Sequence, residues 1–95
     1  MSDVVNAAVA ALGQKLSSGF AGSAKFVIPG EGAIMLDASG VRAADEAADV
    51  TLTADAETFQ AILEGTLNPT AAFMTGKLSV EGDMGQAMQL GAALS

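Results

Sequence analysis

The chain has 95 residues, of which 51% are hydrophobic, and its 11 acidic against 4 basic side chains give a net charge of −7. It contains neither Cys nor His, which excludes zinc fingers, disulfide scaffolds, thiol nucleophiles and Ser-His-Asp triads. The excess of acid also argues against nucleic acid and anionic membranes as partners, because both are bound through clustered Lys and Arg.

The first predicted element is a helix. Ser2 can cap its start, and the Ser-Ser-Gly sequence at 17–19 is expected to end it. This helix should pack one face on the core. The apolar residues that recur at the spacing of that face are Val5, Ala8, Val9, Leu12 and Leu16.

A β-hairpin is predicted next. Two apolar runs, 25–28 and 33–36, flank the turn sequence Pro-Gly-Glu-Gly at 29–32. Both runs are apolar on consecutive residues, which is typical of strands covered on both faces. A second turn signal at 37–40 precedes a short third strand at 41–43.

An acidic connection, a strand and a helix follow. We interpret Asp45, Glu46 and Asp49 as a solvated acidic run. Residues 50–53 alternate between apolar and polar, which predicts a strand with one buried face. Asp55 is a good N-cap for the next helix. The core face and the left-handed end of this helix are expected at Phe59, Ile62, Leu63 and Gly65.

The last third of the chain predicts two helices with a strand between them. Asn68-Pro69 starts a short helix with Ala72 and Phe73 directed inward, which stops at Gly76. Residues 78–81 alternate as a strand. The final helix is expected to be capped by Asp83 with Gln86 three residues on. Its predicted apolar stripe is Met84, Ala87, Met88, Gly91 and Leu94, with Leu90 beside it.

The predicted order is α-β-β-β-β-α-α-β-α, which favours a single α+β domain over residues 1–95. In it, helices pack against a mostly antiparallel sheet. The longest uncharged stretches, 65–76 and 84–95, are shorter than the roughly 20 apolar residues of a membrane span. The chain start does not follow the signal-peptide pattern and its end is not a peroxisomal signal. A cytoplasmic protein without stable membrane insertion is therefore expected.

Several motifs of the second half closely resemble the sterol carrier protein 2 (SCP-2) domain family. They are ADVTLT at 48–53, LEG at 63–65, LNPTAAFMTGKL at 67–78, and GDMG at 82–85 followed by Ala87 and Met88. The match covers roughly residues 48–91. The first half fits the family in the order and length of its elements but carries no motif. The chain looks like a small free-standing bacterial-type member.

The resemblance implies a five-stranded sheet with helices on one side and an apolar cavity between them. The C-terminal helix would cover this lipid tunnel. Members bind fatty acids, fatty acyl-CoA, sterols or phospholipids, alone or fused to enzymes. Some members carry Gln where Thr70 stands here, so one polar anchor is missing. The side chains expected to contact lipid are Phe20, Ile34, Leu36, Phe59, Leu63, Phe73, Met74, Met84, Met88 and Leu90.

Simpler readings compete for some of these residues. Methionine at helical spacing usually fills a core, but its unbranched side chain also adapts to varied apolar ligands. With the resemblance, a ligand-facing role is favoured for Met84 or Met88. Lys77 and Lys25 could meet a ligand carboxylate, although Lys77 is as well explained by contact with a helix C-terminus.

The function expected from the sequence is non-enzymatic binding or transfer of a lipid with a long apolar chain. The carboxylates are expected as caps and surface charges, so no catalytic pair, metal or cofactor is predicted. The alternative is a protein-interaction or accessory module whose groove binds a partner or its own C-terminal helix. The natural lipid and the oligomeric state are left open, a monomer included.

Overall fold

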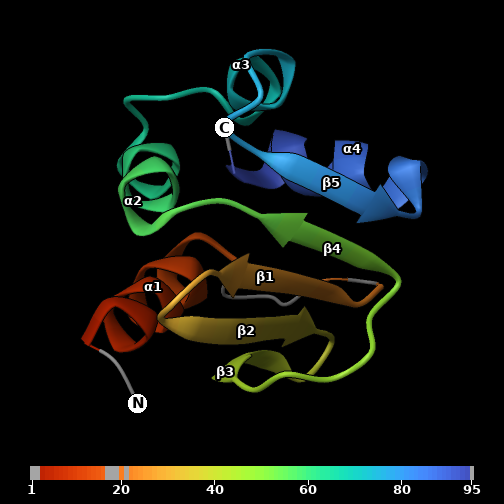
Figure 1. Cartoon of the computed structure of the whole chain (residues 1–95). Helices are drawn as coiled ribbons and strands as arrows, with labels where there is room; N and C mark the ends of the chain where they lie inside the picture. The colour runs from red at the N-terminus through yellow and green to blue at the C-terminus, as the bar shows by residue number, and fades with distance from the viewer. Residues whose placement is uncertain (1–2, 17–19, 21, 95) are drawn as a thin grey trace.

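The computed structural model describes residues 3–16, 20 and 22–94 of the chain. Over these residues the helices and strands follow the predicted order (Figure 1). The predicted cap at Ser2 and the predicted helix end at 17–19 lie outside the described residues. In chain order the elements are α1 (Asp3–Lys15), β1 (Ala24–Ile28), β2 (Gly32–Asp37), β3 (Gly40–Ala43), β4 (Val50–Thr53), α2 (Ala56–Glu64), α3 (Pro69–Met74), β5 (Ser79–Gly82) and α4 (Met84–Leu94).

The strands form one 5-stranded sheet in the order β3-β2-β1-β4-β5. The β1–β2, β2–β3 and β4–β5 pairs are antiparallel, whereas β1 and β4 run parallel. The sheet is therefore mixed but mostly antiparallel, and the helices pack on one of its faces. This confirms the predicted α+β class.

The core lies between the helices and that face of the sheet. Alternate residues of β1, namely Ala24, Phe26 and Ile28, are buried there. The ring of Phe26 meets that of Phe59 in α2 edge to face, with centroids 5.6 Å apart. The helices bury Val5, Ala8, Leu12, Ile62, Ala72, Leu90 and Leu94 in the same cluster.

The opposite face of the sheet is covered by the connection from β3 to β4. Because β4 lies beyond β2 and β1, residues 44–49, here called the crossover segment, must pass across both strands. Met35 of β2 pairs in register with Lys25 and Arg42 on this face, and yet it is only 2% exposed. Consecutive apolar residues of β2 are therefore buried on both sides, as the sequence predicts.

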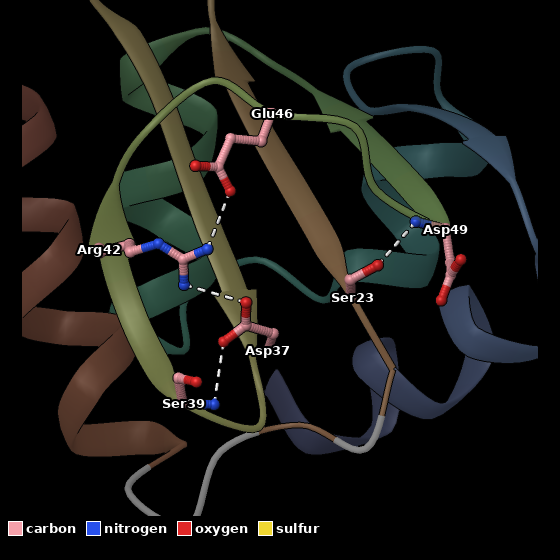
Figure 2. A network of polar contacts seen from close by, with 6 residues as sticks. All are labelled: Ser23, Asp37, Ser39, Arg42, Glu46 and Asp49. Atoms are coloured by element: carbon pink, nitrogen blue, oxygen red, sulfur yellow. Dashed lines mark hydrogen bonds and ion pairs between the residues drawn. The ribbon is translucent and has the colours of Figure 1, made fainter.

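Ion pairs hold the crossover segment against the sheet. Lys25 Nζ lies 3.0 Å from Asp45 Oδ1. The Arg42 guanidinium bridges Asp37 Oδ2 at 2.9 Å and Glu46 Oε1 at 3.0 Å (Figure 2). The interpretation of the acidic run as merely solvated misses this role. The carboxylates of Asp45 and Glu46 stay largely exposed, but they are paired with cations of the strands beneath them.

Asp37 makes this network sensitive to acid. The hydrogen bond from Arg42, and then that from the Ser39 N–H, lower the pKa of the Asp37 carboxyl. Such a carboxyl stabilises the fold above its unfolded-state pKa and loses that contribution as the pH falls through its folded-state pKa.

We therefore expect Arg42→Gln to lose less stability on acidification than the parent. The urea midpoint should be measured at about pH 7 and again at about pH 3. Lys15→Gln is the matched control, because it removes the same charge outside the network. Its urea midpoint should fall between the two pH values by as much as that of the parent. Equal falls for Arg42→Gln and the parent would contradict this role of Asp37.

Local caps place α2 and α3 as predicted. Asp55 Oδ1 accepts the Thr58 N–H at 2.7 Å, and Asn68 Oδ1 accepts the Thr70 N–H at 2.8 Å. The Thr58 hydrogen bonds lower the pKa of Asp55, which keeps this cap ionised. Gly65 ends α2 in the left-handed conformation, with φ 84°. These short-range signals set where α2 and α3 begin and where α2 ends. In the folded chain α3 lies next to α4.

Candidate functional site

Large apolar side chains that remain exposed gather on α3 and α4. Within the described residues they are Phe73 at 45%, Met74 at 79%, Met84 at 50% and Met88 at 75% exposure. Single exposed apolar residues are ordinary on a protein surface, but a contiguous group of them marks an interaction site. The region between these two helices is therefore the candidate site.

An open groove of about 310 Å³ runs between α3, α4 and the β4–β5 edge of the sheet. Leu52 and Leu78 are buried and form its floor, while Phe73, Met84 and Met88 rise along its sides. None of the described residues that line it is charged. We call it the α3–α4 groove, and its chemistry fits an alkyl chain.

Phe73 lies on the groove rather than in the core, so the expectation that it points inward is wrong. Pro69 and Ala72 are the buried residues of α3, three positions apart on one helix face. The next residue along a helix is rotated by about 100°, which moves Phe73 away from the core. In a helix of 6 residues the sequence pattern does not reveal which of two neighbouring apolar residues is buried.

α4 is held by one face and presents another to the groove. Leu90 and Leu94 are 0% and 3% exposed and anchor the helix in the core. At its C-terminal end, Lys15 Nζ donates to the Leu94 carbonyl at 3.4 Å. The predicted stripe is therefore divided. Leu90 faces the core and Met84 and Met88 line the groove, while Leu94 is buried and also borders the groove.

The start of α4 is fastened to Asp49, the last residue of the crossover segment. Asp83 Oδ1 caps α4 by accepting the Gln86 N–H at 3.1 Å, and the Asp83 N–H donates to the Asp49 carbonyl at 2.9 Å. The Gln86 side chain does not turn back to the Asp83 N–H, because its Nε2 donates to Asp49 Oδ2 at 3.1 Å. Gln86 therefore ties α4 to the crossover segment and does not complete the capping box.

A second open groove of about 410 Å³ separates α1 from α2. The residues of α1 that line it are mostly alanines, including Ala7 and Ala11, and their small side chains leave the space between the helices unfilled. Phe59 and Leu63 of α2 form the facing wall. We call this the α1–α2 groove. It shares no described lining residue with the α3–α4 groove.

The structure distributes the residues expected to contact lipid over several places. Phe73, Met84 and Met88 line the α3–α4 groove, whereas Phe59 and Leu63 line the α1–α2 groove. Met74 is exposed and lines neither groove. The other four are buried core residues, namely Phe20, Ile34, Leu36 and Leu90. The two grooves are both open, and a lipid tunnel covered by the C-terminal helix remains a prediction.

Other kinds of site find no support in the described part of the chain. No group of three or more acidic side chains there is placed to hold a metal ion. None of the described helices has the length and apolar character needed to cross a bilayer. Lys25, considered for a ligand carboxylate, points away from the helices and pairs with Asp45. The two apolar grooves remain as candidates.

Comparison with known proteins gives one consistent family. The model of the SCP-2 sterol transfer family matches residues 6–95. Hydroxysteroid dehydrogenase-like protein 2 of Danio rerio is 51% identical over 43 residues, which are 45% of this chain and 10% of that protein. Sterol carrier protein 2 of Homo sapiens is 46% identical over 46 residues, 48% of this chain and 8% of that protein. The match thus spans about a tenth of these relatives.

A solved structure reproduces the fold over the whole chain. Sterol carrier protein 2 of Aedes aegypti, solved in complex with the C16 fatty acid palmitate, has a TM-score of 0.78 and 22% identity. The alignment covers 100% of this chain and 97% of that one. At this level of identity the likeness establishes the fold.

Proposed function

Because this chain belongs to the SCP-2 sterol transfer family, we propose that it is a non-catalytic carrier that binds the alkyl chain of a fatty-acid-like lipid in the α3–α4 groove. One observation carries the proposal. The large apolar side chains that stay exposed within the described residues all lie on α3 and α4, and Phe73, Met84 and Met88 among them line that groove. The palmitate bound by the Aedes aegypti protein is a ligand of the same class. A cytoplasmic location remains a prediction.

Burial of the chain supplies the binding energy. Each CH₂ moved out of water contributes about 0.8 kcal/mol, so a chain of 12–16 carbons gains roughly 10 kcal/mol if it is wholly covered. An open groove of about 310 Å³ covers only part of such a chain. Met84 and Met88 can close over the rest, because unbranched methionine side chains change rotamer at low cost. After the cost of association, micromolar affinity is a reasonable expectation.

Lys15 supplies a cation for the lipid head group at the end of α4. Lys15 Nζ contacts the carbonyl of Leu94, which lines the groove. A carboxylate that emerges there would meet Lys15. Lys25 and Arg42 are already paired with carboxylates on the opposite face of the sheet, and net charge is −7. The protein is therefore poorly equipped for a head that carries several phosphate charges.

We expect palmitate or a fatty alcohol to bind more tightly than acyl-CoA of the same chain length. The difference should grow at low salt, where the negative field of the protein is least screened. Competition titrations at two salt concentrations measure this. If acyl-CoA binds more tightly than palmitate at low salt, a local basic patch outweighs the net charge, contrary to this account.

The alternative, docking of a partner's amphipathic helix, would use the same exposed side chains. Native mass spectrometry of the purified protein separates the two functions. A lipid retained from the expression host supports the carrier. A protein that remains lipid-free, and that still binds no fatty acid when one is added, would leave the interaction module as the better reading.

A further inference from the structure

The α1–α2 groove has the size and lining of a second ligand site. Its volume of about 410 Å³ lies within the range of roughly 300–1,000 Å³ that is usual for small-molecule pockets. Ile28 and Phe59 are buried at its base, and Ala7 and Ala11 leave room above them. An alkyl chain can occupy this space without displacing a side chain.

The charges around this groove differ from those near the α3–α4 groove. Asp3 of α1 and Glu64 of α2 belong to its walls, one from each helix. None of the four basic residues of the chain is among the residues that line it. A fatty acid would bring its carboxylate close to two others, whereas an ammonium group would be attracted by both.

Glu64 also lies at a position in α2 where a carboxylate lowers the stability of the helix. It lies in the last turn of α2, and no basic residue shares that turn. A carboxylate is unfavourable there, because the helix dipole puts partial negative charge at the C-terminal end. The Gln60 amide donates to Glu64 Oε2 at 3.3 Å and directs this carboxylate along the groove side of α2. A cation bound in the groove would offset both negative charges.

From these observations we propose that the α1–α2 groove binds an amphiphile with an alkyl chain and a protonated amine, such as a long-chain primary amine. The chain lies on Ile28 and Phe59, and the ammonium lies between the carboxylates of Asp3 and Glu64. The site does not depend on the carrier function proposed above, because the two grooves share no described lining residue.

The test uses dodecylammonium, dodecanoate and dodecanol at concentrations below micelle formation. Backbone and alanine-methyl NMR shifts locate each ligand, and titration gives its dissociation constant. Dodecylammonium should shift Ala7, Ala11 and Leu63, and it should bind there more tightly than dodecanoate. The variant Met88→Asp should bind it like the parent, which separates this site from the α3–α4 groove.

A pair of variants with equal net charge isolates the local effect. Asp3→Asn/Glu64→Gln removes both wall carboxylates and should raise the dissociation constant for dodecylammonium about fivefold. Glu57→Gln/Glu81→Gln removes two exposed carboxylates outside the groove and should change it by less than about twofold. Dodecylammonium shifts confined to Met84 and Met88 would overturn the proposal. An equal loss of dodecylammonium affinity in the two double variants would overturn it too. So would dodecanoate that binds at Ala7 and Ala11 as tightly as dodecylammonium does.

Discussion

Replacement of Met88 by Asp should weaken binding of palmitate by about 30-fold or more. A carboxylate in the groove must lose water when the chain covers it, and burial of an unpaired polar group costs about 1–3 kcal/mol or more in proteins. The apolar contact of the methionine is lost as well. Because Met88 is 75% exposed without ligand, the substitution should leave the fold intact, and the loss should appear in binding alone.

Gln89→Asp is the matched control for this experiment. It places the same charge one residue further along α4, at an exposed position that does not line the groove. Its palmitate affinity should remain within about twofold of the parent's. If both variants bind palmitate like the parent, the ligand does not lie against this face of α4. Thermal melting of both proteins, measured without ligand, confirms that each is folded.

Gly82→Ala should have the largest effect on stability of any single change considered for this chain. Gly82 has φ 102°, which L side chains rarely adopt, and a Cβ there would collide with the backbone carbonyl oxygen of Asp49. That oxygen also accepts the Asp83 N–H, which fastens α4. We expect a loss of about 3 kcal/mol, which is a fall in melting temperature of roughly 10–20 °C for a domain of this size.

The control for Gly82 is Gly13→Ala in the middle of α1. A Cβ at Gly13 meets no atom within 4 Å beyond the adjoining backbone of α1 itself, and alanine is favoured over glycine in a helix by about 0.5–1 kcal/mol. Gly13→Ala should therefore raise the melting temperature by a few degrees. A Gly82→Ala protein that melts within about 3 °C of the parent would show that the β5–α4 junction can move away from the crossover segment.

The features that the sequence predicts correctly depend mostly on contacts between residues that are close together in the chain. The caps at Asp55 and Asn68 and the left-handed end at Gly65 depend on contacts within a few residues, so their positions were predictable. So was the mostly antiparallel sheet, through its hairpin and its alternating strands. The residues expected to contact lipid were spread over both halves of the chain, and Phe20, Ile34 and Leu36 of the first half are buried in the core.

Features that depend on distant contacts could not be read from the pattern. The parallel pairing of β1 with β4 requires the crossover segment to pass over the face of the sheet opposite the helices. The hydrogen bond of Gln86 to Asp49 joins residues 37 positions apart. The side of α3 that faces the core decides whether Phe73 is buried, and that side is set by how α3 packs on the rest of the fold. The same limit applies to the α1–α2 groove, which exists because the alanine-rich face of α1 meets Phe59 and Leu63 of α2.

Intermolecular NOEs between palmitate and selectively labelled methionine methyl groups test the central claim most directly. The chain has five methionines, of which Met84 and Met88 line the α3–α4 groove and Met35 is buried under the crossover segment as an internal control. This account predicts NOEs from the palmitate methylenes to the methyl groups of Met84 and Met88, and none to that of Met35. Bound palmitate that shows no NOE to Met84 or Met88, and contacts Ala7 and Ala11 instead, would contradict it.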